Sequence, residues 1–206
     1  APYLDNLPTA PREKFAANSA AIQKLKEIEQ RVANGGSPAF EDEQRILAQY
    51  TGWGGLSDAF DPNKSAWSNE YSQLKAALSE SEYEAARSST LTAFYTPATI
   101  IHPIYRALER FGVKGGKILE PSMGTGAFLA HGHFGSSDAK FYGVELDGIT
   151  GRISRQLYQK ANIQVTGYEN ALLPDNYFDC VIGNVPFGNF QVNDPQYNRL
   201  HFPIHD

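Results

Sequence analysis

The 206-residue chain is poor in cysteine, in long apolar runs and in clustered positive charge. Cys180 is its only cysteine, which excludes an intramolecular disulfide and a zinc site built from several thiolates. No apolar run approaches the roughly 20 residues of a membrane-spanning helix, and residues 1–5 do not resemble a signal peptide. These absences favour a soluble protein of a reducing compartment, and we expect it in the cytoplasm.

The net negative charge is unusual for a protein that binds nucleic acid without help from other domains. Residues 1–92 carry a net charge of −4 and residues 93–206 a net charge of −1. DNA-binding surfaces usually cluster Lys and Arg, because contacts with phosphates supply much of the affinity. The sequence has no such cluster. If the chain acts on DNA, we expect most of the DNA contacts to come from regions outside it.

The first ninety or so residues are typical of helices joined by short polar loops. Apolar side chains recur at helical spacing over residues 16–32, and Asn34-Gly35-Gly36 is a typical helix end. Further helices are predicted over residues 41–50, with Ile46 and Leu47 inward, and over 68–78 and 79–88. The last of them opens with a capping box from Ser79 to Glu82. In the glycine-rich loop 50–56, Trp53 is expected to dock the helical part onto the sheet.

After residue 92 the pattern changes to apolar strands alternating with helices. Strands are predicted near residues 117–120, 141–145, 163–166 and 178–183, and helices over 96–111 and 149–159. The first of these helices is expected to have Thr96 as its N-cap, and Asp147 is expected to cap the second. The residues that the first helix is expected to bury are Ile100, Ile101, Ile104, Tyr105 and Leu108. Such alternation indicates a parallel sheet with helices on its faces. We therefore predict the α/β class, with a helical N-terminal subdomain over residues 1–92 and a Rossmann-like sheet domain over 93–206.

A glycine-rich turn directly follows the first predicted strand, in the run Glu120-Pro121-Ser122-Met123-Gly124-Thr125-Gly126. Such a turn can bring backbone amides against a ligand and open a helix N-terminus behind it. The third glycine of the dinucleotide fingerprint is absent, and an acid precedes the turn instead. An ordinary strand-to-helix turn and a dinucleotide site remain the alternatives at this point.

A second acid, Glu145, ends the next predicted strand, 19 residues after Gly126. This spacing is close to the roughly 20 residues at which an acid meets ribose hydroxyls in nucleotide-binding sheets. A carboxylate can accept from both hydroxyls of a vicinal diol. The alternative is a solvated acid at a strand end.

The run Asn184-Val185-Pro186-Phe187 follows the fourth predicted strand. It combines an amide acceptor, a stiffened backbone and a flat stacking surface. The alternative is a strand that ends in a proline-containing turn, with Phe187 in the core. Both motif runs fall at the carboxyl ends of predicted parallel strands, where such sheets bind their ligands.

Taken together with Phe94-Tyr95-Thr96-Pro97, these runs resemble the motifs of S-adenosylmethionine-dependent, adenine-N6-specific DNA methyltransferases of restriction-modification type. The stretch from Tyr50-Thr51-Gly52-Trp53 to Phe187-Gly188-Asn189 is similar to the methylase region of large methylase–helicase proteins of plasmids, phages and conjugative elements. The resemblance implies a Rossmann-like methyltransferase sheet, S-adenosyl-L-methionine as cofactor, and DNA with a flipped target adenine as partner. It implies no metal.

The resemblance also implies which residues hold the cofactor. Glu120 would lie near the methionine amine, Glu145 would accept from the ribose, and Leu146 would pack on the adenine ring. Glu169 would accept from the adenine amine of the cofactor. The full implied set is Tyr95, Thr96, Glu120, Ser122, Gly124, Gly126, Glu145, Leu146 and Glu169.

For catalysis the resemblance implies Asn184, Val185, Pro186 and Phe187. The side-chain oxygen of Asn184 and the carbonyl of Val185 would accept the hydrogens of the target amine, and Phe187 would stack on the flipped base. Val185 departs from the usual Asn/Asp-Pro-Pro-Tyr/Phe pattern. Two alternatives therefore stay open: a non-catalytic module of a larger DNA-processing protein, and a protein glutamine methyltransferase.

Methyltransferase sheets of this kind normally have seven strands, whereas four are predicted here. We therefore expect the sheet domain to be incomplete at its C-terminal end, and to be joined by further domains or a second subunit. An unpaired apolar edge would otherwise be exposed.

Overall fold

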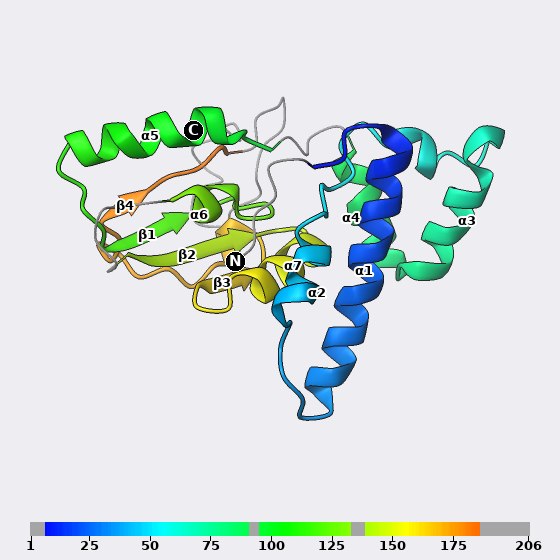
Figure 1. Cartoon of the computed structure of the whole chain (residues 1–206), viewed down its shortest axis with the longest axis horizontal. Helices are drawn as coiled ribbons and strands as arrows, with labels where there is room; N and C mark the ends of the chain where they lie inside the picture. The colour runs from blue at the N-terminus through cyan, green and yellow to red at the C-terminus, as the bar shows by residue number, and fades with distance from the viewer. Residues whose placement is uncertain (1–6, 91–94, 133–138, 186–206) are drawn as a thin grey trace. The chain divides into compact units, whose positions relative to one another are not determined.

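The structure is a computed structural model that describes residues 7–90, 95–132 and 139–185 (Figure 1). The chain forms two compact units. A helical unit contains residues 1–95 and 147–159, and a sheet unit contains residues 96–146 and 160–206. Among the described residues, no helix is both long enough and apolar enough to cross a membrane.

The helical unit confirms the helices that the sequence predicts, with some ends shifted. Its helices are α1 (Pro11–Ala33), α2 (Glu41–Leu47), α3 (Ser68–Ala77), α4 (Glu80–Ser89) and α7 (Gly148–Leu157). Helix α1 begins earlier than predicted, since Pro11 suits the first turn of a helix. The capping box is confirmed: Glu82 N donates to Ser79 Oγ at 3.2 Å, and Ser79 N donates to Glu82 Oε2 at 2.9 Å.

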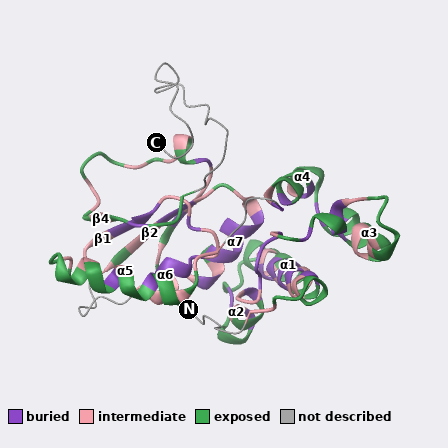
Figure 2. Cartoon of the chain, turned by 90° about the horizontal axis from the view of Figure 1, so that it is seen from above, coloured by how far each residue is buried: buried purple, intermediate pink, exposed green. Residues whose placement is uncertain are grey.

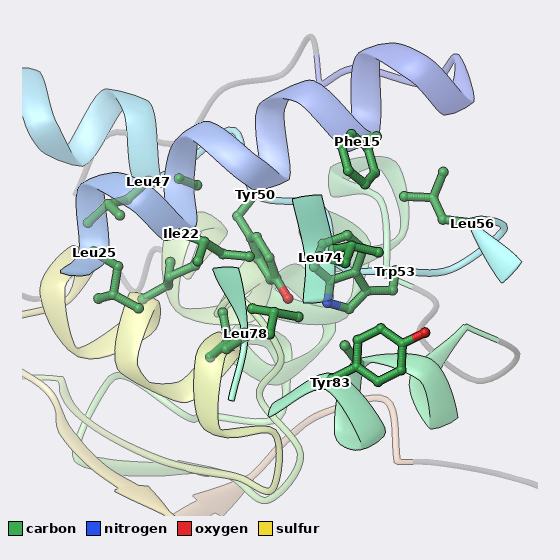
Figure 3. Close-up of a cluster of buried hydrophobic side chains, with 14 of the residues drawn as sticks. Phe15, Ile22, Leu25, Leu47, Tyr50, Trp53, Leu56, Leu74, Leu78 and Tyr83 are labelled. Atoms are coloured by element: carbon green, nitrogen blue, oxygen red, sulfur yellow. The ribbon is translucent and has the colours of Figure 1, made fainter. Parts of the chain in front are cut away.

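The core of the helical unit is built around aromatic rings from the glycine-rich loop and its neighbours (Figure 3). Trp53 is 1% exposed, and its ring meets Phe60 edge-on at a centroid distance of 5.4 Å. Leu47 is buried as predicted. Ile46 is 38% exposed, so the prediction that it points inward is wrong. Because α2 is only two turns long, it presents one narrow face to the core.

A buried amide fixes the backbone of the glycine-rich loop. Asn18, on α1, is 0% exposed. Its Oδ1 accepts from Thr51 N at 2.9 Å, and its Nδ2 donates to Gly52 O at 2.7 Å. Farther along the loop, Gly55 N donates to Thr90 O at 3.1 Å. The loop is therefore held by both α1 and the end of α4.

Ion pairs join the helices of this unit. Arg31 donates to both oxygens of Glu43, at 2.7 and 2.6 Å, and this bonding lowers the pKa of Glu43 to about 2. Arg152, on α7, pairs with Glu29 on α1 and Glu82 on α4. Helix α7 therefore packs with the N-terminal helices, although it follows the second strand of the sheet in the sequence.

The sheet unit has four parallel strands in the order β3-β2-β1-β4, which confirms the predicted parallel sheet. The strands are β1 (Lys117–Glu120), β2 (Lys140–Glu145), β3 (Asn162–Val165) and β4 (Cys180–Val181). Strand β4 is shorter than the predicted 178–183, because it forms ladder pairs with β1 at two positions. All four carboxyl ends lie at the same edge.

Helices α5 (Ala98–Arg110) and α6 (Ala127–His131) lie beside each other next to the sheet (Figure 2). Helix α5 begins later than predicted: Pro97 is its N-cap, so the assignment of Thr96 to that position is wrong. Ile101 and Tyr105, one helical turn apart, are buried as predicted. Ile100 is 52% exposed against the prediction, since it lies to one side of that stripe.

Candidate cofactor and catalytic site

The predicted site residues of the sheet unit gather at the carboxyl edge of the sheet. Glu120 ends β1 and Glu145 ends β2, and these two strands pair directly. Residues 182–185 follow β4, which pairs with β1 on its other side. Strand β1 is therefore flanked at this edge by the end of β2 and by the segment that leads into the predicted catalytic run 184–187.

The turn after β1 folds back across the end of β2. Met123 N donates to Val144 O at 2.9 Å, and Gly126 N donates to Met123 O at 2.8 Å. Gly124 has a φ of 54° and Gly126 a φ of 78°, a region that glycine enters without steric cost. Gly126 is also the N-cap of α6. These two glycines let the backbone reverse tightly before the helix starts.

Glu145 is bonded to this turn. Its Oε2 accepts from Gly124 N at 2.7 Å, so the acid at the end of β2 holds the glycine-rich turn in place. The carboxylate is half-buried. The two features predicted to contact one cofactor, the glycine turn and the second acid, are in direct contact with each other.

Glu120 is buried far more deeply than an ordinary strand-end acid. Its side chain is 2% exposed, and among the described residues its buried Oε2 has no hydrogen-bond partner. Burial, together with the nearby carboxyl of Glu145, raises the pKa of Glu120 well above its usual value. An acceptor buried without a partner in this way is costly to the fold, which suggests that a ligand satisfies it.

Gly183, the residue directly before the predicted catalytic run 184–187, lies against Glu120. A Cβ built on Gly183 would lie 3.5 Å from Cγ of Glu120 and 3.4 Å from Cδ of Pro121. Asn184 and Val185 follow it, and both are exposed. The structure thus brings the residue before Asn184 to Glu120, the first residue of the predicted cofactor run 120–126. Pro186 and Phe187 lie outside the described residues.

The remaining residues of the predicted adenine site lie at the ends of β2 and β3. Leu146 is 76% exposed directly after β2, an unusual position for a large apolar side chain. Thr166 N donates to Glu145 O at 2.9 Å, which keeps the end of β3 beside the end of β2. Glu169 follows in a short 3-10 turn (Tyr168–Asn170) and is half-buried, and its Oε1 accepts from Asn170 Nδ2 at 2.9 Å.

Three further residues of the predicted set are less closely tied to this edge. Ser122 is half-buried within the glycine-rich turn, and Thr96 is half-buried just before α5. Tyr95 belongs to the helical unit. There its hydroxyl lies against Gly52: a Cβ built on that glycine would be 2.6 Å from the oxygen.

The structure adds Tyr105 to the surroundings of the site. Its hydroxyl donates to Phe128 O at 2.9 Å, and both burial and the nearby Glu120 raise the pKa of Tyr105. The sequence predicts Tyr105 as a buried residue of its helix and assigns it no part in the site. A phenol on an otherwise apolar helix face was the signal available, because a buried Tyr hydroxyl needs a partner.

Two methyltransferases are among the solved structures to which the chain shows a partial similarity. One is a TehB-like SAM-dependent methyltransferase from Corynebacterium glutamicum, with 20% identity, a TM-score of 0.32, and 39% of this chain and 42% of that chain covered. Another is a protein-L-isoaspartate O-methyltransferase, with 14% identity, a TM-score of 0.37, and 54% of this chain and 45% of that chain covered. Similarity at this level carries no argument about activity.

Two curated relatives are similar in sequence. Defense against restriction protein B of Escherichia phage P1 is 29% identical over 179 residues, which are 86% of this chain and 6% of that protein. Modification methylase CviBIII of Paramecium bursaria Chlorella virus NC1A is 32% identical over 95 residues, which are 46% of this chain and 25% of that protein. The chain thus spans a small part of each relative. Residues 80–203, more than half of the chain, match the family described as N-6 DNA Methylase, and the chain belongs to this family of S-adenosyl-L-methionine-dependent methyltransferases.

Proposed function

We propose that this chain transfers a methyl group from S-adenosyl-L-methionine to the exocyclic amine of adenine in DNA. One observation carries the proposal: Gly183, the residue directly before the predicted catalytic run 184–187, lies against Glu120, the first residue of the predicted cofactor run 120–126. Two motifs some sixty residues apart in the sequence therefore start from one place at the edge of the sheet. The family description and the name of the relative CviBIII, a modification methylase, agree with this function.

The residues at this edge fit the cofactor. The buried, unpartnered Oε2 of Glu120 suits the ammonium of the methionine moiety, which brings N–H donors and positive charge. Glu145 suits the ribose hydroxyls, and the exposed Leu146 offers an apolar surface for the adenine ring. When bound, S-adenosyl-L-methionine supplies an electrophilic methyl group on a sulfonium.

The same assignment covers the rest of the predicted cofactor set. Glu169 would accept from the amine of the cofactor's adenine. Ser122, Gly124 and Gly126 would line the methionine and ribose through the turn. Tyr95 and Thr96 would complete the methionine end.

Asn184 and Val185 have the groups needed to prepare the target amine. The nitrogen lone pair of adenine N6 is delocalised into the ring, so the amine is a weak nucleophile. The side-chain oxygen of Asn184 and the carbonyl of Val185 can each accept one amine hydrogen and favour a tetrahedral nitrogen. No general base is needed before transfer, since the proton can leave afterwards.

Phe187 would hold the target base outside the duplex, because the amine is not reachable within the stack. Stacking on an aromatic side chain contributes about 1–3 kcal/mol per base. Pro186 would limit the backbone freedom between Val185 and Phe187. Since the net charge is −5, we expect most DNA contacts to come from other parts of a longer restriction-modification or mobile-element protein.

The test separates binding from turnover. We expect calorimetry to detect S-adenosyl-L-methionine binding to the chain, and mass spectrometry to detect N6-methyladenine in unmodified DNA after incubation with it. Replacing Asn184 with Ala is expected to lower transfer by at least about 100-fold, as for the loss of a key hydrogen-bonding group in a transition state. Cofactor affinity should stay within about twofold, because Asn184 is assigned to the target amine.

Asn63→Ala, at an exposed position of the helical unit, is the control and should leave both quantities unchanged. If the wild-type chain binds the cofactor but transfers nothing, the non-catalytic alternative raised by Val185 gains support. Methylation of a protein glutamine with none on DNA would support the glutamine methyltransferase alternative. Normal turnover of Asn184→Ala would show that the assignment of Asn184 is wrong.

A further inference from the structure

Among the described residues, the electrostatic neighbours of Glu120 are a second acid and a phenol. Strand β2 contributes the carboxyl of Glu145, and α5 contributes the hydroxyl of Tyr105. Within the described ranges no Lys, Arg or His acts on the Glu120 carboxyl. The hydroxyl of Tyr105 donates a hydrogen bond to Phe128 O.

Keeping the Glu120 carboxyl ionised in this buried environment has a high free-energy cost. Removing an ionised carboxyl from water costs several kcal/mol unless a cation or several donors replace the water. Two carboxylates that share a site disfavour double ionisation further. One proton must therefore be retained by the pair in the ligand-free protein.

The geometry indicates which of the two acids retains that proton. Glu145 is half-buried, and its Oε2 accepts from Gly124 N, a bond that stabilises the ionised form. Glu120 is 2% exposed, and no donor among the described residues reaches its Oε2. Ionisation is therefore less costly at Glu145 than at Glu120.

We propose that Glu120 is a neutral carboxylic acid in the ligand-free protein and releases its proton to solvent when the ammonium group of the cofactor binds beside it. This inference rests on the proposed function, because it takes the cofactor's ammonium as the incoming cation. The balance is simple: one O–H bond of Glu120 breaks, the proton leaves to buffer, and the resulting carboxylate pairs with the ammonium. The site thereby exchanges one positive charge for another.

The exchange is measurable without turnover. S-adenosyl-L-methionine is titrated into the chain by calorimetry at one pH in several buffers that differ in their enthalpy of ionisation. The slope of observed enthalpy against buffer ionisation enthalpy counts the protons released. At about pH 6.5 the α-amino group of the ligand is already protonated, because its ordinary pKa is about 8, so the ligand itself takes up no proton.

The wild-type chain is expected to release protons on cofactor binding at this pH, up to one per cofactor. Below the pKa of Glu120, affinity should rise by up to about tenfold per pH unit, since each unit corresponds to a tenfold change in the ionised fraction. Glu120→Gln should bind without proton release and with no such pH dependence. Glu109→Gln, at an exposed position of α5, is the control and should behave as wild type. An analogue that lacks the amino group should also bind without proton release.

Infrared difference spectra give a second measurement that needs no variant. On cofactor binding, the carbonyl band of a protonated carboxyl should disappear, and a carboxylate band should appear. If the wild-type chain binds the cofactor with no proton release and no change in this band, the inference is wrong while the proposed function stands. If the chain binds no S-adenosyl-L-methionine at any pH, the proposed function itself fails, and the inference fails with it.

Discussion

Two buried glutamates, one in each unit, show how differently the two parts of the molecule treat charge. In the helical unit, Glu43 is 8% exposed and receives two bonds from Arg31 and one from Phe40 N. In the sheet unit, Glu120 is 2% exposed and faces another acid. The pKa of the first is lowered and the pKa of the second is raised. A paired charge stabilises a scaffold, whereas a buried acid without a partner agrees with the ligand-binding role that we propose for Glu120.

The largest effect is expected from removing the indole ring of Trp53, which lies at the centre of the core of the helical unit. We expect Trp53→Ala to lower the free energy of unfolding of the helical unit by about 3–5 kcal/mol, as for other large core truncations. Both tryptophans of the chain, Trp53 and Trp67, lie in this unit, so Trp67 fluorescence during urea unfolding reports on it alone. Trp53→Phe is the control and should lose much less. A loss below about 1 kcal/mol for the Ala variant would contradict the packing described.

Removing the buried amide should have the next largest effect. Asn18→Ala leaves Thr51 N and Gly52 O without their bonds to the side chain, and each unsatisfied buried group costs about 1–3 kcal/mol. We expect a total loss of about 2–3 kcal/mol in urea unfolding, together with faster hydrogen exchange in the loop 50–56. Gln23→Ala, at an exposed position of the same helix, should change neither. Unchanged exchange in the loop would show that Asn18 does not hold it.

The paired glutamate should show a stability contribution that depends on pH. We expect Glu43→Gln to lower the free energy of unfolding at pH 7 by about 1–3 kcal/mol, the range for bonds to charged groups. Because the folded-state pKa of Glu43 is lowered to about 2, this contribution is fully present above about pH 4.5, the usual pKa of a glutamate, and is lost as pH falls from there toward 2.

The difference between wild type and Glu43→Gln should therefore shrink steadily over that acid range. Glu41→Gln, which breaks the exposed pair with Arg45 on the same helix, is the matched control and should cost at most about 1 kcal/mol. If the two variants give equal losses at pH 7, the buried pair has no special role in this unit.

The unpartnered glutamate should show the opposite sign and the smallest effect. Its folded-state pKa is raised, so the folded state retains a proton that the unfolded chain loses above pH 4.5. The free energy of unfolding of the wild type then falls with rising pH, whereas that of Glu120→Gln does not show this dependence. Between pH 5 and 6 the Gln variant should gain at most about 1.4 kcal/mol on wild type, the limit for one proton.

Hydrogen exchange of the β1 and β2 amides, measured without cofactor, follows this change in the sheet unit. A Glu120→Gln variant that is less stable than wild type at every pH would mean that Glu120 has a structural partner. The contrast between the two glutamates would then disappear.

Local signals predicted the elements well, and tertiary contacts explain the failures. The Ser79–Glu82 box, the Asp147 cap of α7 and the strand Lys117–Glu120 all follow from short patterns that neighbouring residues enforce. The shorter β4 depends on how far β1 extends beside it, which no pattern within residues 178–183 contains. The exposure of Ile46 and Ile100 likewise depends on which neighbour covers each helix face.

The site could be predicted in its residue types but not in its electrostatics. Glu120 and Glu145 were identifiable as strand-end acids beside a glycine turn. That Gly124 would bond to Glu145, or that Tyr105 would lie near Glu120, depends on the order of strands in the sheet and on the packing of α5. The roles of Asn184 and Val185 stay predictions, and Pro186 and Phe187 lie outside the described residues.

The place of α7 in the sequence has a consequence for the way the polypeptide matures on the ribosome. Its apolar residues Ile149, Ile153 and Leu157 belong to the same core as Leu25 and Ile28 of α1, yet they are synthesised more than a hundred residues later. The core of the N-terminal helices can therefore be completed only after β1, β2 and α7 have been synthesised. Removing residues 1–92 would expose the apolar face of α7 to solvent. Neither unit can therefore be expressed as one continuous segment of the chain.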